Sequence, residues 1–234
     1  MIALTQDMAN RIRQLSGRPS PVPIIRIWAD DELFAIDHAA AARAARLRLG
    51  VSESRSLVGF AGSFGKKQHL PELVAALREL PDTFATIFVG DGPECADMER
   101  LAAHGPGDLR ILPSQSSSDL HAFLSACDVS IVTAWTRHAG SLFPSKVANV
   151  LAAGSPILAI AERNTELATL LEREDIGITC SGLEAGQIRE AAQLGVQLGR
   201  DDKRRTRCRR YAELNLHRRY AMRRFVEEID RLVG

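Results

Sequence analysis

The chain has 234 residues, of which 45% are hydrophobic and 25% charged, a composition that suits one sizeable globular core with a small appendage. Thirty Lys and Arg residues nearly balance 29 Asp and Glu residues, so no overall field favours nucleic acid as a partner. The four cysteines are widely spaced and form no CxxC pair, which argues against a zinc site or a redox couple. The longest apolar stretch, residues 147–161, is shorter than the roughly 20 residues needed to cross a bilayer. The N-terminus also lacks the features of a signal peptide, so we expect a cytoplasmic protein.

The first 54 residues predict isolated elements rather than a domain. Residues 2–5 indicate a strand and residues 6–15 a helix, and the proline-rich stretch 18–28 indicates a linker with a second strand. A helix over residues 39–50 is expected to end at Gly50. We interpret Trp28 as a packed residue of the linker.

From residue 55 to residue 199, strand patterns alternate with helical patterns. Short apolar runs indicate strands buried on both faces at residues 58–62, 86–90, 109–112, 129–133, 156–160 and 176–180. Apolar residues at helical spacing indicate helices at residues 71–80, 95–104, 118–127, 144–154 and 165–174. This alternation predicts an α/β, Rossmann-like fold with a parallel sheet between helices. Residues 200–232 indicate two basic helices that close the domain.

Two glycine-containing segments follow predicted strands. The first holds Gly62 and Gly65, whose spacing fits neither a Walker A loop nor GxGxxG, and continues into Lys66 and Lys67. Such a turn lets backbone N–H groups approach a phosphate, although a packing role for the small residues is equally compatible with the pattern. The second segment holds Gly90 and Gly92 in a tight turn, a pattern that is most often structural.

A third segment, residues 141–158, places Ser145 and Lys146 in the first turn of a predicted helix at the carboxyl ends of the strands. A lysine there opposes the helix dipole, and an anionic ligand would relieve that conflict. The alternative is an exposed lysine with no function. We favour the ligand.

Taken in order, segments 2–12, 25–34, 46–51, 59–77, 88–94, 109–132, 143–159 and 164–171 resemble the donor-binding domain of glycosyltransferase family 4, a group with the GT-B fold. The resemblance covers nearly the whole chain and is strongest to the branch of colanic acid, O-antigen and capsule enzymes. No single motif is specific, but the ordered set is.

The resemblance implies a set of donor-binding residues. The diphosphate would be held by the turn after the first strand, the sugar and ribose would face the helix that starts near Lys146, and the base would contact the loop around Pro113. Cationic side chains would neutralise the diphosphate, so we expect no metal and no cofactor. The donor-binding residues implied are Gly62, Ser63, Gly65, Lys66, Lys67, Gln68, Gly90, Gly92, Pro113, Ser145, Lys146, Asn149 and Glu166.

The chain also departs from the family pattern. Many members carry two glutamates where this sequence has Ser141 and Asn149, so ribose binding through a carboxylate is not expected, although Asn149 can still hydrogen-bond a hydroxyl. His138 is the one candidate catalytic residue, and the alternative for it is an ordinary surface histidine.

The resemblance implies three parts: residues 1–54 as a remnant of the N-terminal acceptor domain with the interdomain linker, residues 55–199 as the nucleotide-sugar-binding domain, and residues 200–234 as basic closing helices. The implied function is a retaining hexosyl- or deoxyhexosyltransferase of bacterial surface polysaccharide synthesis, with a nucleotide diphosphate sugar as donor and a lipid-linked or polysaccharide acceptor.

Because an acceptor domain is missing, three situations stay open: a truncated product, a subunit that works with a separate acceptor-domain chain, or a non-catalytic binding or interaction module. A nucleotide-sugar epimerase of the same fold is a further rival. The basic C-terminal segment permits peripheral contact with anionic lipid at the inner face of the membrane, but a solvated helix face is the preferred interpretation.

Overall fold

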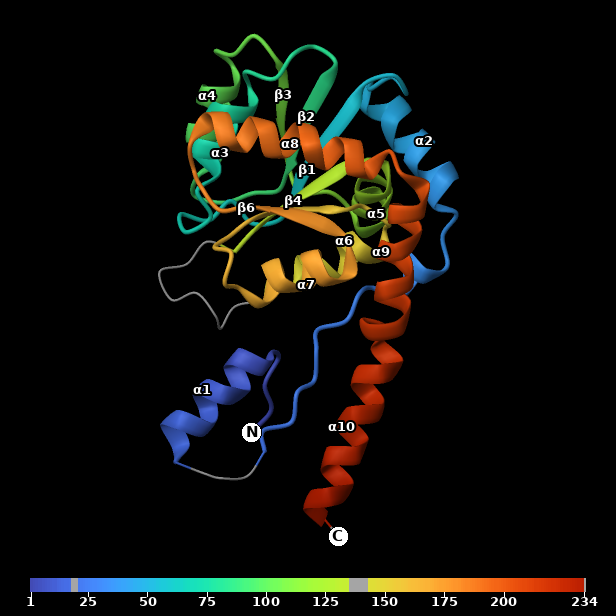
Figure 1. The fold of residues 1–234 in the computed structure, drawn as a ribbon. Coiled ribbons are helices and arrows are strands. Elements are labelled where there is room, and N and C mark those ends of the chain that lie inside the picture. Colours follow the sequence, from blue (N-terminus) through green and yellow to red (C-terminus); the bar gives the residue numbers. More distant parts are fainter. Residues whose placement is uncertain (18–20, 135–142, 234) are drawn as a thin grey trace.

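The computed structural model describes residues 1–17, 21–134 and 143–233. Its centre is a six-stranded sheet in the order β3-β2-β1-β4-β5-β6, with every neighbouring pair parallel (Figure 1). The strands are β1 (Ser56–Ala61), β2 (Phe84–Val89), β3 (Asp108–Leu112), β4 (Val129–Thr133), β5 (Ile157–Ile160) and β6 (Gly177–Cys180). All six predicted strands and the Rossmann-like fold are thereby confirmed.

Helices cover both faces of the sheet. They are α2 (His38–Leu49), α3 (Leu70–Leu77), α4 (Cys95–Ala102), α5 (Ser117–Ala126), α6 (Lys146–Ala152), α7 (Glu166–Glu174), α8 (Ala185–Gly199) and α9 (Asp202–Asn215). Alternate strand residues point to opposite faces, so that Leu57 joins the core beneath α2, α5, α6, α7 and α9, whereas Val58 joins the core beneath α3, α4 and α8. The two cores sandwich the sheet and fix the positions of the loops at its edges.

The sequence did not indicate α8, because Gly186, Gly195 and Gly199 lower its helix propensity. Two of these glycines are explained by packing. A Cβ at Gly195 would lie 2.9 Å from the Val129 side chain, and one at Gly199 would lie 1.5 Å from the carbonyl oxygen of Asp128. Glycine therefore lets α8 approach the start of β4 closely.

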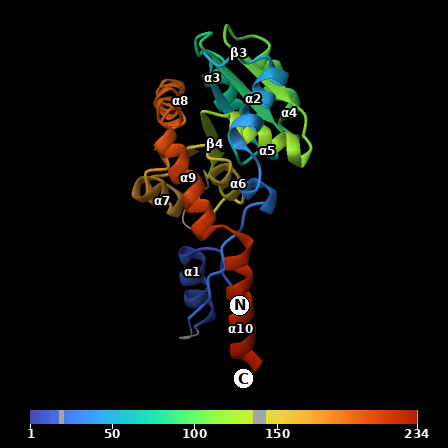
Figure 2. The ribbon, with the colours of Figure 1, turned by 90° about the vertical axis from the view of Figure 1, so that its right-hand side faces the viewer.

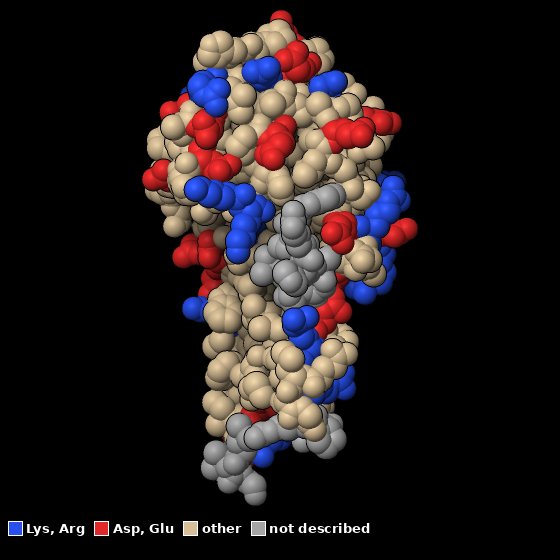
Figure 3. All heavy atoms as spheres, turned by 90° about the vertical axis from the view of Figure 1, so that its left-hand side faces the viewer, with Lys and Arg blue, Asp and Glu red and all other residues tan. Residues whose placement is uncertain are grey.

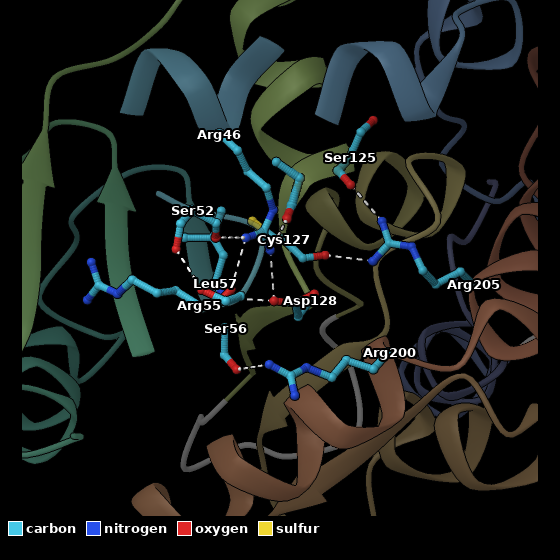
Figure 4. Close-up of polar contacts among 12 residues, drawn as sticks. Arg46, Ser52, Arg55, Ser56, Leu57, Ser125, Cys127, Asp128, Arg200 and Arg205 are labelled. Carbon is cyan, nitrogen blue, oxygen red and sulfur yellow. Dashed lines mark hydrogen bonds and ion pairs between the residues drawn. The ribbon is translucent and has the colours of Figure 1, made fainter. Parts of the chain in front are cut away.

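An arginine network joins the elements at the amino end of the sheet (Figure 4). Arg46 of α2 donates to the carboxylate of Asp128 at 2.8 Å and to the carbonyl of Ala126, and Asp128 also accepts the backbone N–H of Leu57 at 2.7 Å. Arg205 of α9 donates to the carbonyl oxygen of Cys127 at 2.8 Å. The network ties α2, α9, β1 and β4 together at the edge opposite the strands' carboxyl ends.

The N-terminal and C-terminal segments extend from one end of this body (Figures 1 and 2). They comprise α1 (Gln6–Ser16) and α10 (Arg218–Val233). The two strands predicted within residues 2–5 and 18–28 are reduced to a single parallel bridge between Ala3 and Ile24. The bridge is isolated among the described residues.

The linker is held to the body and to the C-terminal helices. The linker contains a short 3-10 helix, η1 (Asp31–Phe34), and the ring of its last residue, Phe34, stacks on His217 at 4.5 Å between centroids. Asp31 pairs with Arg218 at 2.6 Å. Trp28, predicted to be packed, has 41% of its surface exposed and lines a groove beside α10.

Candidate functional site

The connection from β1 to α3 lies at the carboxyl end of the sheet, next to β4. Because the chain runs outward in one direction from β1 and in the other from β4, this is the topological switch point where open α/β sheets bind ligands. The connection starts at Gly62 and is anchored by Phe64, which is fully buried. The Phe64 N–H donates to the carbonyl of Asp91 at 2.8 Å, and its own carbonyl accepts the N–H of Glu94 at 3.1 Å. The predicted glycine turn is therefore a rigid loop.

The glycines of the two strand-end loops make this rigidity possible. Gly62 has a φ of 142° and Gly90 a φ of 158°, values that L residues rarely adopt. A Cβ at Gly90 would lie 1.9 Å from the carbonyl oxygen of Gly62, and one at Gly92 would lie 2.6 Å from that of Phe64. Gly90 and Gly92, in the loop after β2, therefore allow the loop after β1 to pack directly against their backbone.

Lys146 contributes the most unusual group of the site. It is the first residue of α6, and its ammonium nitrogen is buried without a hydrogen-bond partner among the described residues, although other parts of the side chain are accessible. The nitrogen lies 3.8 Å from the centroid of the Phe60 ring and would be 2.6 Å from a Cβ at Gly62. Burial lowers the pKa of the Lys146 ammonium to about 8. A cation that has no counterion in the described part of the chain therefore points at the base of the glycine loop.

The other predicted residues of the loop have more ordinary surroundings. Ser63, Lys66 and Lys67 are exposed. Gln68 braces the loop: its amide nitrogen donates to the carbonyl of Ser63 at 2.9 Å, and its amide oxygen accepts from the Thr133 hydroxyl at 3.2 Å. This contact ties the loop to the end of β4.

Residues from neighbouring strand ends complete the edge. Pro113 is exposed directly after β3. Ser145 is the N-cap residue of α6, one position before the helix in which it was predicted, and its side chain makes no capping bond. Gly65 lies at the turn into Gln68, whose backbone N–H donates to the Gly65 carbonyl at 3.0 Å.

Asn149 is engaged by the linker. Its amide oxygen accepts the backbone N–H of Asp30 at 2.9 Å, and its amide nitrogen donates to the Asp30 carboxylate at 2.9 Å. The same carboxylate lies 2.9 Å from Nε2 of His121, a buried residue of α5. Sequence reasoning missed this cluster, because Asp30 lies 91 positions from His121 and 119 positions from Asn149, and no local pattern links residues so far apart.

Glu166 begins α7 and contacts the linker as well. Its Oε1 lies 3.5 Å from the guanidinium of Arg26, while its Oε2 is buried without a hydrogen-bond partner in the described part of the chain. Glu166 therefore contacts the linker. It takes no part in the contacts described between Lys146 and the glycine loop.

Charge is distributed unevenly over this side of the molecule. In Figure 3, which faces the left-hand side of Figure 1, one cluster of Lys and Arg side chains lies near the middle, and other basic and acidic side chains are scattered above and beside it. The described residues contain no group of three His, Cys, Asp or Glu residues placed to hold a metal ion. His138 and Ser141 lie outside the described residues. Among the described helices, none is long and apolar enough to span a membrane.

Comparison with known proteins gives a consistent picture. The family model described as glycosyl transferases group 1 matches residues 43–214. The chain is 29% identical over 236 residues to the putative colanic acid biosynthesis glycosyl transferase WcaI of Escherichia coli (strain K12), covering 97% of this chain and 56% of that protein. It is 25% identical over 186 residues to the probable glycosyltransferase WbjE of Pseudomonas aeruginosa, covering 77% and 45%. The chain thus spans about half the length of these curated relatives.

A solved structure shares the fold over nearly the whole of this chain. The crystal structure of Anabaena Alr3699/HepE in complex with UDP and glucose superposes with a TM-score of 0.74 at 19% identity, covering 98% of this chain and 62% of that one. At this identity the likeness concerns the fold.

Proposed function

The chain belongs to the glycosyl transferases group 1 family, and we propose that within this family it forms the donor-binding half, which holds a nucleotide diphosphate sugar at the carboxyl end of the sheet. The observation that carries the proposal is the ammonium of Lys146 beside the Gly62 loop, which has no hydrogen-bond partner among the residues that the structure describes. A buried cation without a counterion is costly, and an anionic group of a ligand would satisfy it. The similarity of fold to a protein solved with UDP and glucose supports this choice of ligand.

In the proposed complex the diphosphate lies on the loop from Gly62 to Gly65. Lys146 neutralises it from below, and the exposed Lys66 and Lys67 do so from the solvent side. Pro113, at the end of β3, would border the base. These cations would supply the charge that a metal supplies elsewhere.

The reaction proposed is retaining transfer of a hexosyl or deoxyhexosyl group to a lipid-linked or polysaccharide acceptor in surface polysaccharide synthesis. The names of the two curated relatives support glycosyl transfer, and the first of them also supports a role in the synthesis of a surface polysaccharide. Since the chain spans about half of each relative, we propose that the acceptor-binding half comes from residues outside these 234, at the inner face of the membrane.

The donor site is tested by calorimetric titration of the purified chain with UDP and with GDP. We expect saturable binding of one of them, weakened about 10-fold or more in Lys146→Met, because charge-assisted hydrogen bonds contribute roughly 1.5–3 kcal/mol. Lys203→Met, an exposed lysine of α9, is the matched control and should bind as the original chain does. A folded chain that binds neither nucleotide would refute the donor site.

A second candidate is a binding module without catalysis. The engagement of Asn149 favours it, since both polar groups of its amide are already hydrogen-bonded to Asp30 and a donor hydroxyl would have to compete for them. Measuring hydrolysis of a bound nucleotide sugar distinguishes an enzyme from a binding module without catalysis. Slow release of free sugar from a bound nucleotide sugar supports an enzyme, and tight binding with an intact donor supports a module.

A further inference from the structure

A cavity of about 630 Å³ lies beside the arginine network at the amino end of the sheet. Its walls come from the linker and the start of α2, the end of α5, and the junction between α8 and α9. Four arginines line it: Arg46 from α2, Arg200 from the junction, and Arg205 and Arg209 from α9. The balance of charge around these arginines determines what the cavity can hold.

Carboxylates neutralise only part of this charge. Asp128 lines the cavity and pairs with Arg46 at 2.8 Å. The carboxylate of Asp37 accepts two backbone N–H groups in the first turn of α2. Asp202 is exposed in the first turn of α9 and forms no ion pair among the described residues. Three arginines of the cavity therefore lack a carboxylate partner in the part of the chain that the structure describes: Arg200, Arg205 and Arg209.

Helix α9 divides four of its arginines into two pairs. Arg204 and Arg207 both pair with the carboxylate of Asp175. Arg205 and Arg209 are one turn apart and line the cavity instead. Like charges at this spacing on a helix repel each other. The side of α9 that faces the cavity therefore carries two neighbouring cations, neither of which has an ion-pair partner among the described residues.

The guanidinium groups of this pair are held in position. Arg205 donates to the carbonyl oxygens of Ser125 and Cys127, at 2.6 and 2.8 Å, across the end of α5 (Figure 4). Arg209 lies against Gly154, where a Cβ would be only 2.3 Å from its Nη1. Its one hydrogen bond among the described residues goes to a hydroxyl of its own helix and is long, at 3.5 Å. Arg209 therefore keeps most of its five N–H donors available for a ligand.

The charges of these arginines also affect a neighbouring histidine. His38, near the start of α2, lines the same cavity. Burial and the charges of Arg209 and Arg205 lower the pKa of His38, while the Leu33 backbone and Asp37 act in the opposite direction. Each of the two arginines has a larger effect than Asp37. The wall of the cavity is therefore electropositive at this point, and an anion would be attracted to it.

We propose that this cavity binds a phosphate group of a small soluble ligand, held by Arg205 and Arg209 with Arg200 at the rim. Guanidinium groups bind phosphate through paired N–H donors. A phosphate monoester carries about two negative charges and three acceptor oxygens, which is enough to engage two cations that repel each other. The site lies at the opposite edge of the sheet from Lys146, so it is independent of the proposed donor site.

Calorimetric titration with pyrophosphate at constant ionic strength tests the site. The titration uses Lys146→Met, in which anion binding at the glycine loop is weakened. We expect saturable binding, and a further Arg209→Gln substitution should weaken it about tenfold or more, because charge-assisted hydrogen bonds are lost. Arg210→Gln, at an exposed residue of α9 outside the cavity, is the matched control and should leave binding unchanged. Arg200→Gln, at an exposed position, is a second variant that should also weaken binding without disturbing the core.

An NMR titration of the histidines locates the bound anion. Pyrophosphate should raise the pKa of His38, because it offsets the charges of Arg205 and Arg209. The resonances of His104, an exposed residue that follows α4, should not move.

Three results would overturn the proposal. The first is a folded chain that shows no saturable binding of pyrophosphate. The second is binding that Arg209→Gln and Arg210→Gln weaken equally, since the anion would then lie outside the cavity. The third is binding to vesicles that contain phosphatidylglycerol but not to pyrophosphate, which would assign the arginines to a lipid head group. None of these results bears on nucleotide binding at Lys146, which has its own test.

Discussion

Replacing Lys146 by methionine separates the stability of the chain from its proposed ligand binding. The substitution keeps the length and most of the apolar volume of the side chain but removes its charge. In the free protein that charge is buried without a hydrogen-bond partner among the described residues, over the ring of Phe60. We therefore expect Lys146→Met to be more stable than the original chain and to bind nucleotide less well.

The size of the effect follows from the pKa. Burial lowers the pKa of Lys146 from its usual 10.5 to about 8. A difference of about 2.5 pH units corresponds to roughly 3 kcal/mol against the charged form. The contact with Phe60 returns about 1–2 kcal/mol of this, so desolvation dominates. The net gain expected at neutral pH is about 1–2 kcal/mol, or a melting temperature higher by roughly 2–8 °C.

The gain should depend on pH with a definite sign. Below about pH 8 the lysine is protonated in both the folded and the unfolded chain, and the burial penalty is complete. Between about pH 8 and pH 10.5 the folded chain loses the proton while the unfolded chain keeps it, so the stability of the original chain rises with pH. The advantage of Lys146→Met should therefore be largest below pH 8 and shrink above it.

Urea unfolding of both proteins from pH 6.5 to pH 10 measures this difference, in which the titration of all other groups cancels. Lys203→Met serves as the control and should show no pH-dependent gain, since Lys203 is exposed. Calorimetry near pH 8.5 in buffers of different ionisation enthalpy should detect proton uptake as nucleotide binds. If Lys146→Met were less stable than the original chain at pH 7, the ammonium would already be satisfied, and the reasoning for the site would fail.

Three further predictions follow from packing. Gly90→Ala should lower the free energy of unfolding by about 2–3 kcal/mol and weaken nucleotide binding, because its Cβ would lie 1.9 Å from the carbonyl oxygen of Gly62; urea unfolding and calorimetry measure both. Asp30→Ala should cost about 2 kcal/mol in urea unfolding, because it removes the hydrogen-bond partner of buried His121 and of Asn149. In the native chain a thiol reagent should label Cys95 first, since the other three cysteines are buried and burial raises the pKa of two of them to about 12; mass spectrometry identifies the labelled peptide.

Each of these predictions has a control. Gly186→Ala, at a glycine with open space around it, should leave stability and binding unchanged, and an equal loss there would contradict the packing argument for Gly90. Glu53→Ala, at an exposed carboxylate, should not affect unfolding. If Cys95→Ser kept the rapid labelling phase, another cysteine would be accessible and the core would be less closed than described.

The fold was predictable because its signals are local. Each strand is a short apolar run. Gly62, Gly90 and Pro113 directly follow the first three of them, and Ser116 marks the start of α5, where its hydroxyl accepts the Asp119 N–H. Two regions were not predicted well. The glycines of α8 serve contacts with β4 that no local pattern contains, and the strands expected near Ala3 and Ile24 lack neighbours.

The site was predictable in part for the same reason. The sequence placed Lys146 beside the glycine loop, because both lie at strand ends that a parallel sheet brings together. Three features depend on side-chain positions that spacing does not encode: the burial of its ammonium with no partner among the described residues, the ring of Phe60 beneath it, and the link from Asn149 to Asp30. The donor-binding roles themselves stay predictions.

The arginine network at the amino end of the sheet has a consequence for how this chain can change. The contacts that join α2, α9, β1 and β4 lie at one edge, while the exposed residues Ser63 and Pro113 lie at the other. Substitutions at these exposed positions of the carboxyl-end loops can therefore be sampled without loosening the scaffold. A library built at Ser63 and Pro113 should yield folded variants at high frequency, which makes this edge a practical place to redesign ligand preference.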